Sequence, residues 1–173
     1  MGDLKKNTLT LIVIVIVLVA LVGIAIGTEL KGIIVKPDSA DTYEEESQIY
    51  KALGNYFAQK GEHEEAIIAY EKSLIYTEDQ DVRNNLAILY HQTEDYTKAI
   101  EHLRILVDLE TDNPSYHYDL AVNLVDRFRS SKEQSLQDLL DAIEEYEKAE
   151  ELEPGYEYAK ENIEVLKRIL KIE

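Results

Sequence analysis

The sequence predicts an all-α protein: an N-terminal transmembrane helix followed by three helix-turn-helix repeats and a capping helix. Three observations lead to this fold class. There is no charged residue between Lys6 and Glu29. Apolar residues recur at helical intervals from Thr42 to Ile172. No stretch shows strand alternation bounded by hairpin turns, and the segment 62–154 contains no glycine.

The first element is the predicted transmembrane helix over residues 8–27, preceded by a short polar N-terminus at 1–7. Roughly 20 residues at about 1.5 Å each span on the order of 30 Å, the thickness of the hydrocarbon core. The apolar Ile/Val run is too long for a strand, and in lipid a helix satisfies its own backbone groups. A cleaved signal peptide is the alternative, because Ala25-Ile26-Gly27 has the small-x-small form of a cleavage site.

The predicted span implies a single-pass protein of the cell membrane. Lys5 and Lys6 precede it, whereas the lysines that follow are interleaved with acidic residues. This bias favours the extracytoplasmic side for the repeats, with the cytoplasmic side left open. Gly23 and Gly27 form a G-x-x-x-G, through which two copies could form a homodimer.

Residues 28–42 show no sustained period and are predicted to be a linker, after which a helical domain extends over 43–173. Capping-box spacing at Thr42 and Glu45 marks the start of its first helix. Asn113-Pro114 supplies a cap and a first-turn proline for another. The seven expected helices are Glu44–Lys60, Glu62–Tyr76, Asp81–Gln92, Tyr96–Leu109, Pro114–Phe128, Glu133–Leu152 and Tyr156–Lys171.

Internal self-similarity defines the repeats within this domain. The segments that begin at Tyr50 and Arg83 align without a gap: each has a small residue, an aromatic three positions later and an alanine twelve positions later. A third segment begins at His117 and carries about nine additional residues within 129–139. Helices of about 14 residues cannot bury an apolar face alone, so the units are expected to stack.

This pattern resembles the tetratricopeptide repeat (TPR) family, through Gly54, Phe57 and Tyr70 in the first unit and the equivalent positions of the next two. Ser73 departs from the family pattern, which usually has alanine there. The resemblance implies a right-handed superhelix with repeats at about 47–79, 80–113 and 114–155 and a cap at 156–171. It also implies that small residues lie where helices cross, namely Gly54, Ala66, Ala87, Ala99, Ala121, Ala142 and Ala149.

Composition and motifs exclude several functions. A net charge of −17 argues against a nucleic-acid partner and favours a basic protein or peptide. The absence of cysteine removes disulfide frameworks and Cys-ligated metals. The four histidines show no metal-binding spacing, and no catalytic constellation or phosphate-binding loop occurs. We therefore expect no enzyme activity, no metal and no cofactor.

The family geometry implies a concave groove lined by the first helix of each unit. Its expected residues are polar with aromatic inclusions, which suits an extended peptide. They are Gln48, Lys51, Asn55, Gln59, Asn84, Asn85, Ile88, His91, Tyr118, Val122, Asp126 and Tyr158. Part of the family clamps a C-terminal carboxylate; Lys51, Asn55 and Asn85 match that set, but the two basic positions hold Pro114 and Tyr118.

The expected function is a membrane-anchored scaffold that binds a protein partner or extended peptide in this groove and mediates complex assembly. Two alternatives remain open at this stage. One is a chaperone-like or translocation-associated factor for unfolded clients. The other is a structural subunit of a larger membrane complex, held by its anchor helix.

Overall fold

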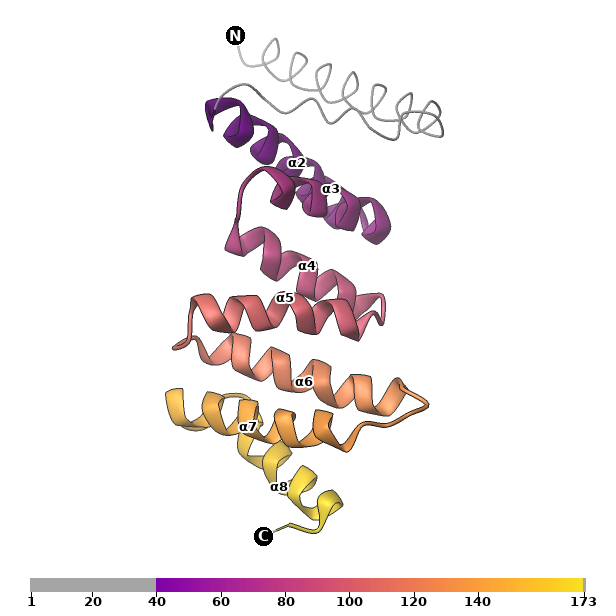
Figure 1. Cartoon of the computed structure of the whole chain (residues 1–173), viewed down its shortest axis with the longest axis vertical. Helices are drawn as coiled ribbons and strands as arrows, with labels where there is room; N and C mark the ends of the chain where they lie inside the picture. The colour runs from indigo at the N-terminus through magenta and orange to yellow at the C-terminus, as the bar shows by residue number, and fades with distance from the viewer. Residues whose placement is uncertain (1–39, 173) are drawn as a thin grey trace. The chain divides into compact units, whose positions relative to one another are not determined.

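The computed structural model describes residues 40–172, which form seven α-helices and no strand. Figure 1 shows these helices lying in chain order, so that each helix packs on those next to it in the sequence. Successive helices form antiparallel hairpins with short connections, the arrangement expected for a repeat array. Their bounds are α2 Ala40–Lys60, α3 His63–Tyr76, α4 Gln80–Gln92, α5 Tyr96–Leu109, α6 Pro114–Ser130, α7 Leu136–Leu152 and α8 Ala159–Leu170.

The membrane-spanning part of the predicted fold class is corrected. Within residues 40–172, no helix is long and apolar enough to cross a membrane, because every helix interrupts its apolar stripe with charged residues. The described fold is an all-α array without a transmembrane helix, and the predicted cell-membrane localisation, which rested on that helix, is corrected with it. The stretch 8–27 and the glycines Gly23 and Gly27 lie outside the described residues.

The helix bounds differ from the predicted ones mainly at N-termini. Helix α2 begins at Ala40, inside the predicted linker. Asp79 caps α4 by accepting a hydrogen bond from the Val82 amide at 3.1 Å, so that helix begins at Gln80. Helix α7 begins at Leu136, because Gln134 adopts a left-handed backbone (φ 39°) that ends the preceding connection. The additional residues of the third unit therefore lengthen α6 and its connection to α7.

The small residues expected at helix crossings are all buried. Gly54 shows why size matters at these places: a Cβ built on it would lie 2.4 Å from ring atoms of Tyr70. Ser73, the departure from the family pattern, is also buried. Its hydroxyl donates to the Ser47 carbonyl at 2.9 Å, and the two hydroxyls lie 3.0 Å apart. Serine is thus accommodated between α2 and α3 because both hydroxyls are paired.

Two groups of buried residues form the core. The N-terminal core cluster links α3, α4 and α5 and consists of Ala66, Tyr70, Val82, Leu86, Leu89, Tyr90 and Ala99. The C-terminal core cluster extends from α4 to α8 and consists of Ala87, Ile100, Leu103, Leu106, Leu120, Ala121, Leu124, Leu139, Ala142, Ile143, Tyr146, Ala159 and Leu166. Helix α4 contributes to both clusters, so it joins the two ends of the array.

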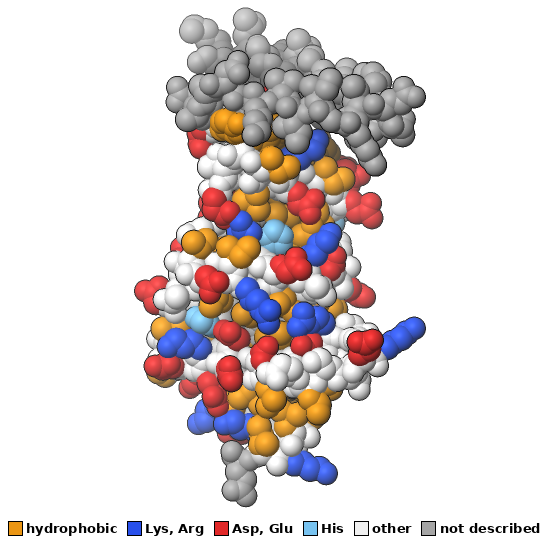
Figure 2. Space-filling model, viewed as in Figure 1, with side chains coloured by type: hydrophobic (Ala, Val, Ile, Leu, Met, Phe, Trp, Pro, Cys, Tyr) orange, Lys and Arg blue, Asp and Glu red, His pale blue; other side chains and the backbone are white. Residues whose placement is uncertain are grey.

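The described surface carries interspersed charges and an apolar region at the C-terminal end of the array (Figure 2). Figure 2 shows hydrophobic side chains gathered at the C-terminal end of the array. Helix α8 contributes the exposed apolar residues Val165 and Ile169 there, and Ile172 follows just after the helix; all three are at least 44% exposed. Its opposite face carries Ala159 and Leu166, which are buried in the C-terminal core cluster. Helix α8 therefore covers the core on one side and leaves a second apolar stripe in solvent.

Candidate peptide-binding groove

A cavity of about 140 Å³ lies between α4 and α6, above α5. Ala87 and Leu103 are buried core residues and form its floor. Its other lining residues project from the facing sides of α4 and α6, and the complete lining is Asn84, Ala87, Ile88, His91, Gln92, Leu103, Asp119, Val122 and Asn123. The cavity therefore combines an apolar base with polar walls, as peptide- and ligand-binding sites usually do.

Helical spacing brings these residues together. On α4, Asn84, Ile88 and His91 follow one another at intervals of four and three, which places them on one helix face. On α6, Asp119 and Asn123 are four residues apart and flank Val122 on the same side. Four residues that the sequence predicted for the groove line the cavity, namely Asn84, Ile88, His91 and Val122.

The wall between His91 and α6 is fixed by hydrogen bonds. His91 Nδ1 donates to Asn123 Oδ1 at 3.0 Å, and Asn123 Nδ2 donates to the Asp119 carbonyl at 2.8 Å. Asn123 is only 4% exposed, so pairing both ends of its amide removes a desolvation cost. By contrast, the side-chain amides of Asn84 and Gln92 hydrogen-bond to no residue in the described range 40–172. They remain able to bond to a ligand.

Among the described residues, Asp119 is the one acidic residue that lines the cavity. Its carboxylate is half-buried and accepts a long hydrogen bond of 3.5 Å from Ser115 Oγ. It forms no salt bridge with any described residue. Burial is the main cause that raises the pKa of Asp119, and Glu157 raises it further, while Ser115 and His91 oppose the shift. A neighbouring cation would stabilise this carboxylate.

The three residues that match a carboxylate clamp are engaged within the chain. Lys51 Nζ lies 2.7 Å from Asp79 and 3.1 Å from Asp81, and the hydrogen bond that Lys51 donates to Asp79 is the main cause that raises the pKa of Lys51. The Tyr70 hydroxyl donates to Asn55 at 2.6 Å and accepts from Asn85 at 3.4 Å. With its lysine already paired to two carboxylates, this region is poorly suited to bind a peptide C-terminus.

The other predicted groove residues lie outside the cavity. Tyr118 turns toward the end of the array, where its ring packs edge-on against Tyr146 and Tyr156 at 5.3 and 5.7 Å. Tyr158 is 66% exposed. The remaining three are the exposed Gln48 and Gln59 on α2 and the half-buried Asp126, which lies 3.6 Å from Arg129.

Sequence reasoning missed Asp119 and Asn123. The signal was present, because each lies three residues before a predicted groove residue of α6, at Val122 and Asp126. The sequence assigned Tyr118, Val122 and Asp126 to the groove, whereas the face of α6 that lines the cavity carries Asp119, Val122 and Asn123. Among the residues that the structure describes, no group of three His, Asp or Glu side chains could hold a metal ion.

Comparison with known proteins agrees with this architecture. Family models described as tetratricopeptide repeats match residues 47–74 and 83–115. Similar solved structures include the first TPR of Spaghetti (RPAP3) bound to the HSP90 peptide SRMEEVD, with a TM-score of 0.60 and 21% identity over 74% of this chain and 95% of that chain.

Two further structures are of the same kind. The first is YrrB, described as a TPR protein with an unusual peptide-binding site (TM-score 0.61, 21% identity, 72% of this chain and 60% of that chain). The second is the Sgt2 TPR domain from Aspergillus fumigatus (TM-score 0.56, 24% identity, 73% of this chain and 80% of that chain). The chain thus carries tetratricopeptide repeats and has their fold, which confirms the resemblance found in the sequence. This fold is a scaffold for protein–protein interaction.

Proposed function

We propose that this protein is an interaction scaffold that binds one extended segment of a protein partner in the groove between α4 and α6. The observation that carries the proposal is the cavity itself, which has an apolar floor and two side-chain amides, Asn84 and Gln92, that bond to no residue within 40–172. An extended peptide exposes backbone N–H and C=O groups at regular intervals, and side-chain amides can pair with both kinds. Ile88, 45% exposed, adds an apolar contact at the rim.

Two further points support this assignment. On a similar fold, the RPAP3 structure holds a bound HSP90 peptide, and YrrB is described as having an unusual peptide-binding site. The net charge of −17 favours a basic partner over an acidic one. Because Lys51 is already paired with Asp79 and Asp81, it is not available to bind a C-terminal carboxylate. The bound segment is therefore an internal part of the partner chain.

Site-specific photo-crosslinking tests the proposal. The chain contains no cysteine, so a single introduced cysteine can carry a benzophenone label. The full-length Ile88→Cys variant labels the groove, and Ile68→Cys on α3, which is 55% exposed, is the matched control outside the cavity. We expect Ile88→Cys to crosslink one partner in a defined segment, and a synthetic peptide of that segment to bind the unlabelled protein with 1:1 stoichiometry.

Two results would reject this function. Equal crosslinking from positions 68 and 88 would show that the groove has no special role. Crosslinking of many unrelated segments from position 88 would identify a chaperone-like activity on unfolded clients in its place. A Val122→Glu variant provides a further check, because a charge on the cavity wall should abolish binding of the synthetic peptide.

A further inference from the structure

The carboxylates near the groove differ in how they are neutralised. Asp79 pairs with Lys51, and Asp126 lies within 3.6 Å of Arg129. Asp119, between them in the array, has only the long hydrogen bond from Ser115. Within residues 40–172, it is the carboxylate that lines the cavity and has no cationic partner.

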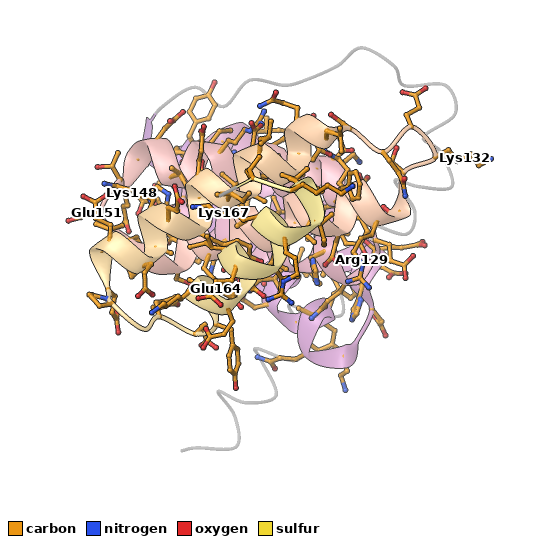
Figure 3. The ribbon with its side chains drawn as sticks, turned by 90° about the horizontal axis from the view of Figure 1, so that it is seen from below. Arg129, Lys132, Lys148, Glu151, Glu164 and Lys167 are labelled. Carbon is orange, nitrogen blue, oxygen red and sulfur yellow. The ribbon has the colours of Figure 1, made fainter. Side chains whose placement is uncertain are left out.

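The basic residues at the end of α6 do not supply the missing charge. Arg127 binds Asp138 through two hydrogen bonds of 2.9 and 2.8 Å. Arg129 is the partner of Asp126. Figure 3 shows Arg129 and Lys132 at the edge of the molecule opposite Lys148 and Glu151, where they project outward. Within residues 40–172, the negative charge of Asp119 is therefore not neutralised by any basic side chain.

We propose that Asp119 makes the α4–α6 cavity a specificity site for one lysine or arginine side chain of the bound segment. This inference rests on the proposed function, because the cation is carried by a peptide in the groove. The aliphatic stem of the ligand residue packs between Ile88 and Val122, above the floor formed by Leu103. Its charged end meets the Asp119 carboxylate, and the Asn84 amide oxygen accepts one of the remaining N–H groups.

The burial of Asp119 gives this contact its selectivity. A carboxylate partly removed from water gains more from a cation than an exposed one does, because solvent screens the pair less. A neutral side chain of the same length would fill the cavity but leave the carboxylate unpaired. A glutamate would place a further negative charge beside the Asp119 carboxylate, whose ionised form the Glu157 charge already disfavours. The cavity should therefore bind a lysine or arginine side chain most tightly, a neutral side chain of the same length less tightly, and a glutamate least.

A peptide array tests this specificity with the full-length protein. The probes are immobilised ten-residue peptides with randomised uncharged flanks and a central lysine, arginine, norleucine, citrulline or glutamate. We expect binding to the lysine and arginine probes to exceed binding to norleucine and citrulline by about tenfold or more. The Asp119→Asn variant keeps the shape of the side chain and should lose this difference, whereas Asp119→Lys should favour the glutamate probes.

The matched control is Asp126→Asn, which removes the same charge from the same helix but from a residue paired with Arg129. It should retain the preference for lysine and arginine. Thermal unfolding of each variant confirms that it remains folded. An unchanged cation preference in Asp119→Asn, or a loss equally large in Asp126→Asn, would overturn the inference and leave the proposed function intact. Failure of every probe to bind the wild-type groove would instead count against the proposed function.

Discussion

Gly54 illustrates how a single position sets the distance between two helices. Glycine inside a helix normally costs about 1 kcal/mol relative to alanine, because the unfolded chain is more flexible. Here the Tyr70 ring occupies the space that a Cβ would need, at 2.4 Å. The ring cannot move away easily, because Tyr70 is 2% exposed and its hydroxyl donates to Asn55. Steric exclusion therefore outweighs helix propensity at this residue.

We predict that Gly54→Ala lowers the free energy of unfolding by about 1–2 kcal/mol, because overpacking costs more than the gain in propensity. Urea unfolding followed by circular dichroism measures the change. In a Tyr70→Leu background the same substitution should cost less, since the obstructing ring is gone. Equal costs in both backgrounds would show that the Tyr70 ring is not the obstacle.

His102 is a half-buried histidine whose surroundings favour its neutral form. Its ring stacks on Tyr90, with centroids 5.6 Å apart, and its Nδ1 accepts a hydrogen bond from Arg83 at 3.3 Å. Burial is the main cause that lowers the pKa of His102 from 6.5, and Arg83 lowers it further, while Glu71, Glu78 and Glu101 oppose the shift. Protonation would also break the bond from Arg83, because Nδ1 could no longer accept.

This lowered pKa predicts a pH dependence of stability. The unfolded chain binds a proton at His102 more readily than the folded chain does, so the contribution is complete above pH 6.5 and is lost as the pH falls below that value. Between about pH 7.5 and pH 5, the free energy of unfolding of wild type should fall more steeply than that of His102→Gln. Superimposable pH profiles of the two proteins would exclude this role for His102.

At the scale of elements, α6 and α7 are joined by a charge pair that is largely buried. Arg127 forms two hydrogen bonds with Asp138, which is 7% exposed and lies in the first turn of α7. This pair raises the pKa of Arg127, chiefly through the hydrogen bond with Asp138. The pair ties the start of α7 to the end of α6 after an irregular connection.

We predict that Arg127→Met costs about 3 kcal/mol of stability, because it leaves the Asp138 carboxylate buried without a partner. Asp138→Asn should cost less, since the Arg127 side chain is 27% exposed and can reach water. The double variant Arg127→Met/Asp138→Asn should recover part of the loss, because no unpaired charge is then left. Urea unfolding of the four proteins forms a complete cycle, and strictly additive losses would contradict the coupling.

Most elements could be predicted from the sequence, because their signals are local. Helix α5 has the predicted bounds Tyr96–Leu109, and α6 begins at Pro114 as the cap and proline indicate. The connection before α7 could not be placed, because Gln134 takes a left-handed backbone that is typical of glycine. Nor could the sequence show that Tyr70 engages Asn55 and Asn85, since that contact depends on how α2, α3 and α4 cross.

At the scale of the whole molecule, stability is divided between the two core clusters. The N-terminal core cluster draws its buried residues from α3 to α5 and packs against Phe57 and Ala58 of α2, whereas the C-terminal core cluster extends to α8. Repeat arrays of this kind unfold locally, because each unit rests on its neighbours alone. Position within the array should therefore decide which helices respond to a core substitution.

We predict that Ala142→Leu, which overfills a site with no exposed surface, destabilises the chain by about 1–3 kcal/mol. Hydrogen exchange should show lost protection in α6, α7 and α8, with α3 retaining most of its protection. Ala99→Leu is the matched variant in the N-terminal core cluster and should reverse this distribution. Uniform loss of protection from α2 to α8 in both variants would mean that the array unfolds as a single unit.

The bridge from Lys51 to Asp79 and Asp81 spans the joint between the first two repeats. Dissolved ions weaken partly exposed charge pairs, so the contribution of this salt bridge to the packing of the two repeats decreases as the ionic strength rises. Added salt should therefore loosen the packing of the first repeat on the second before any helix unfolds.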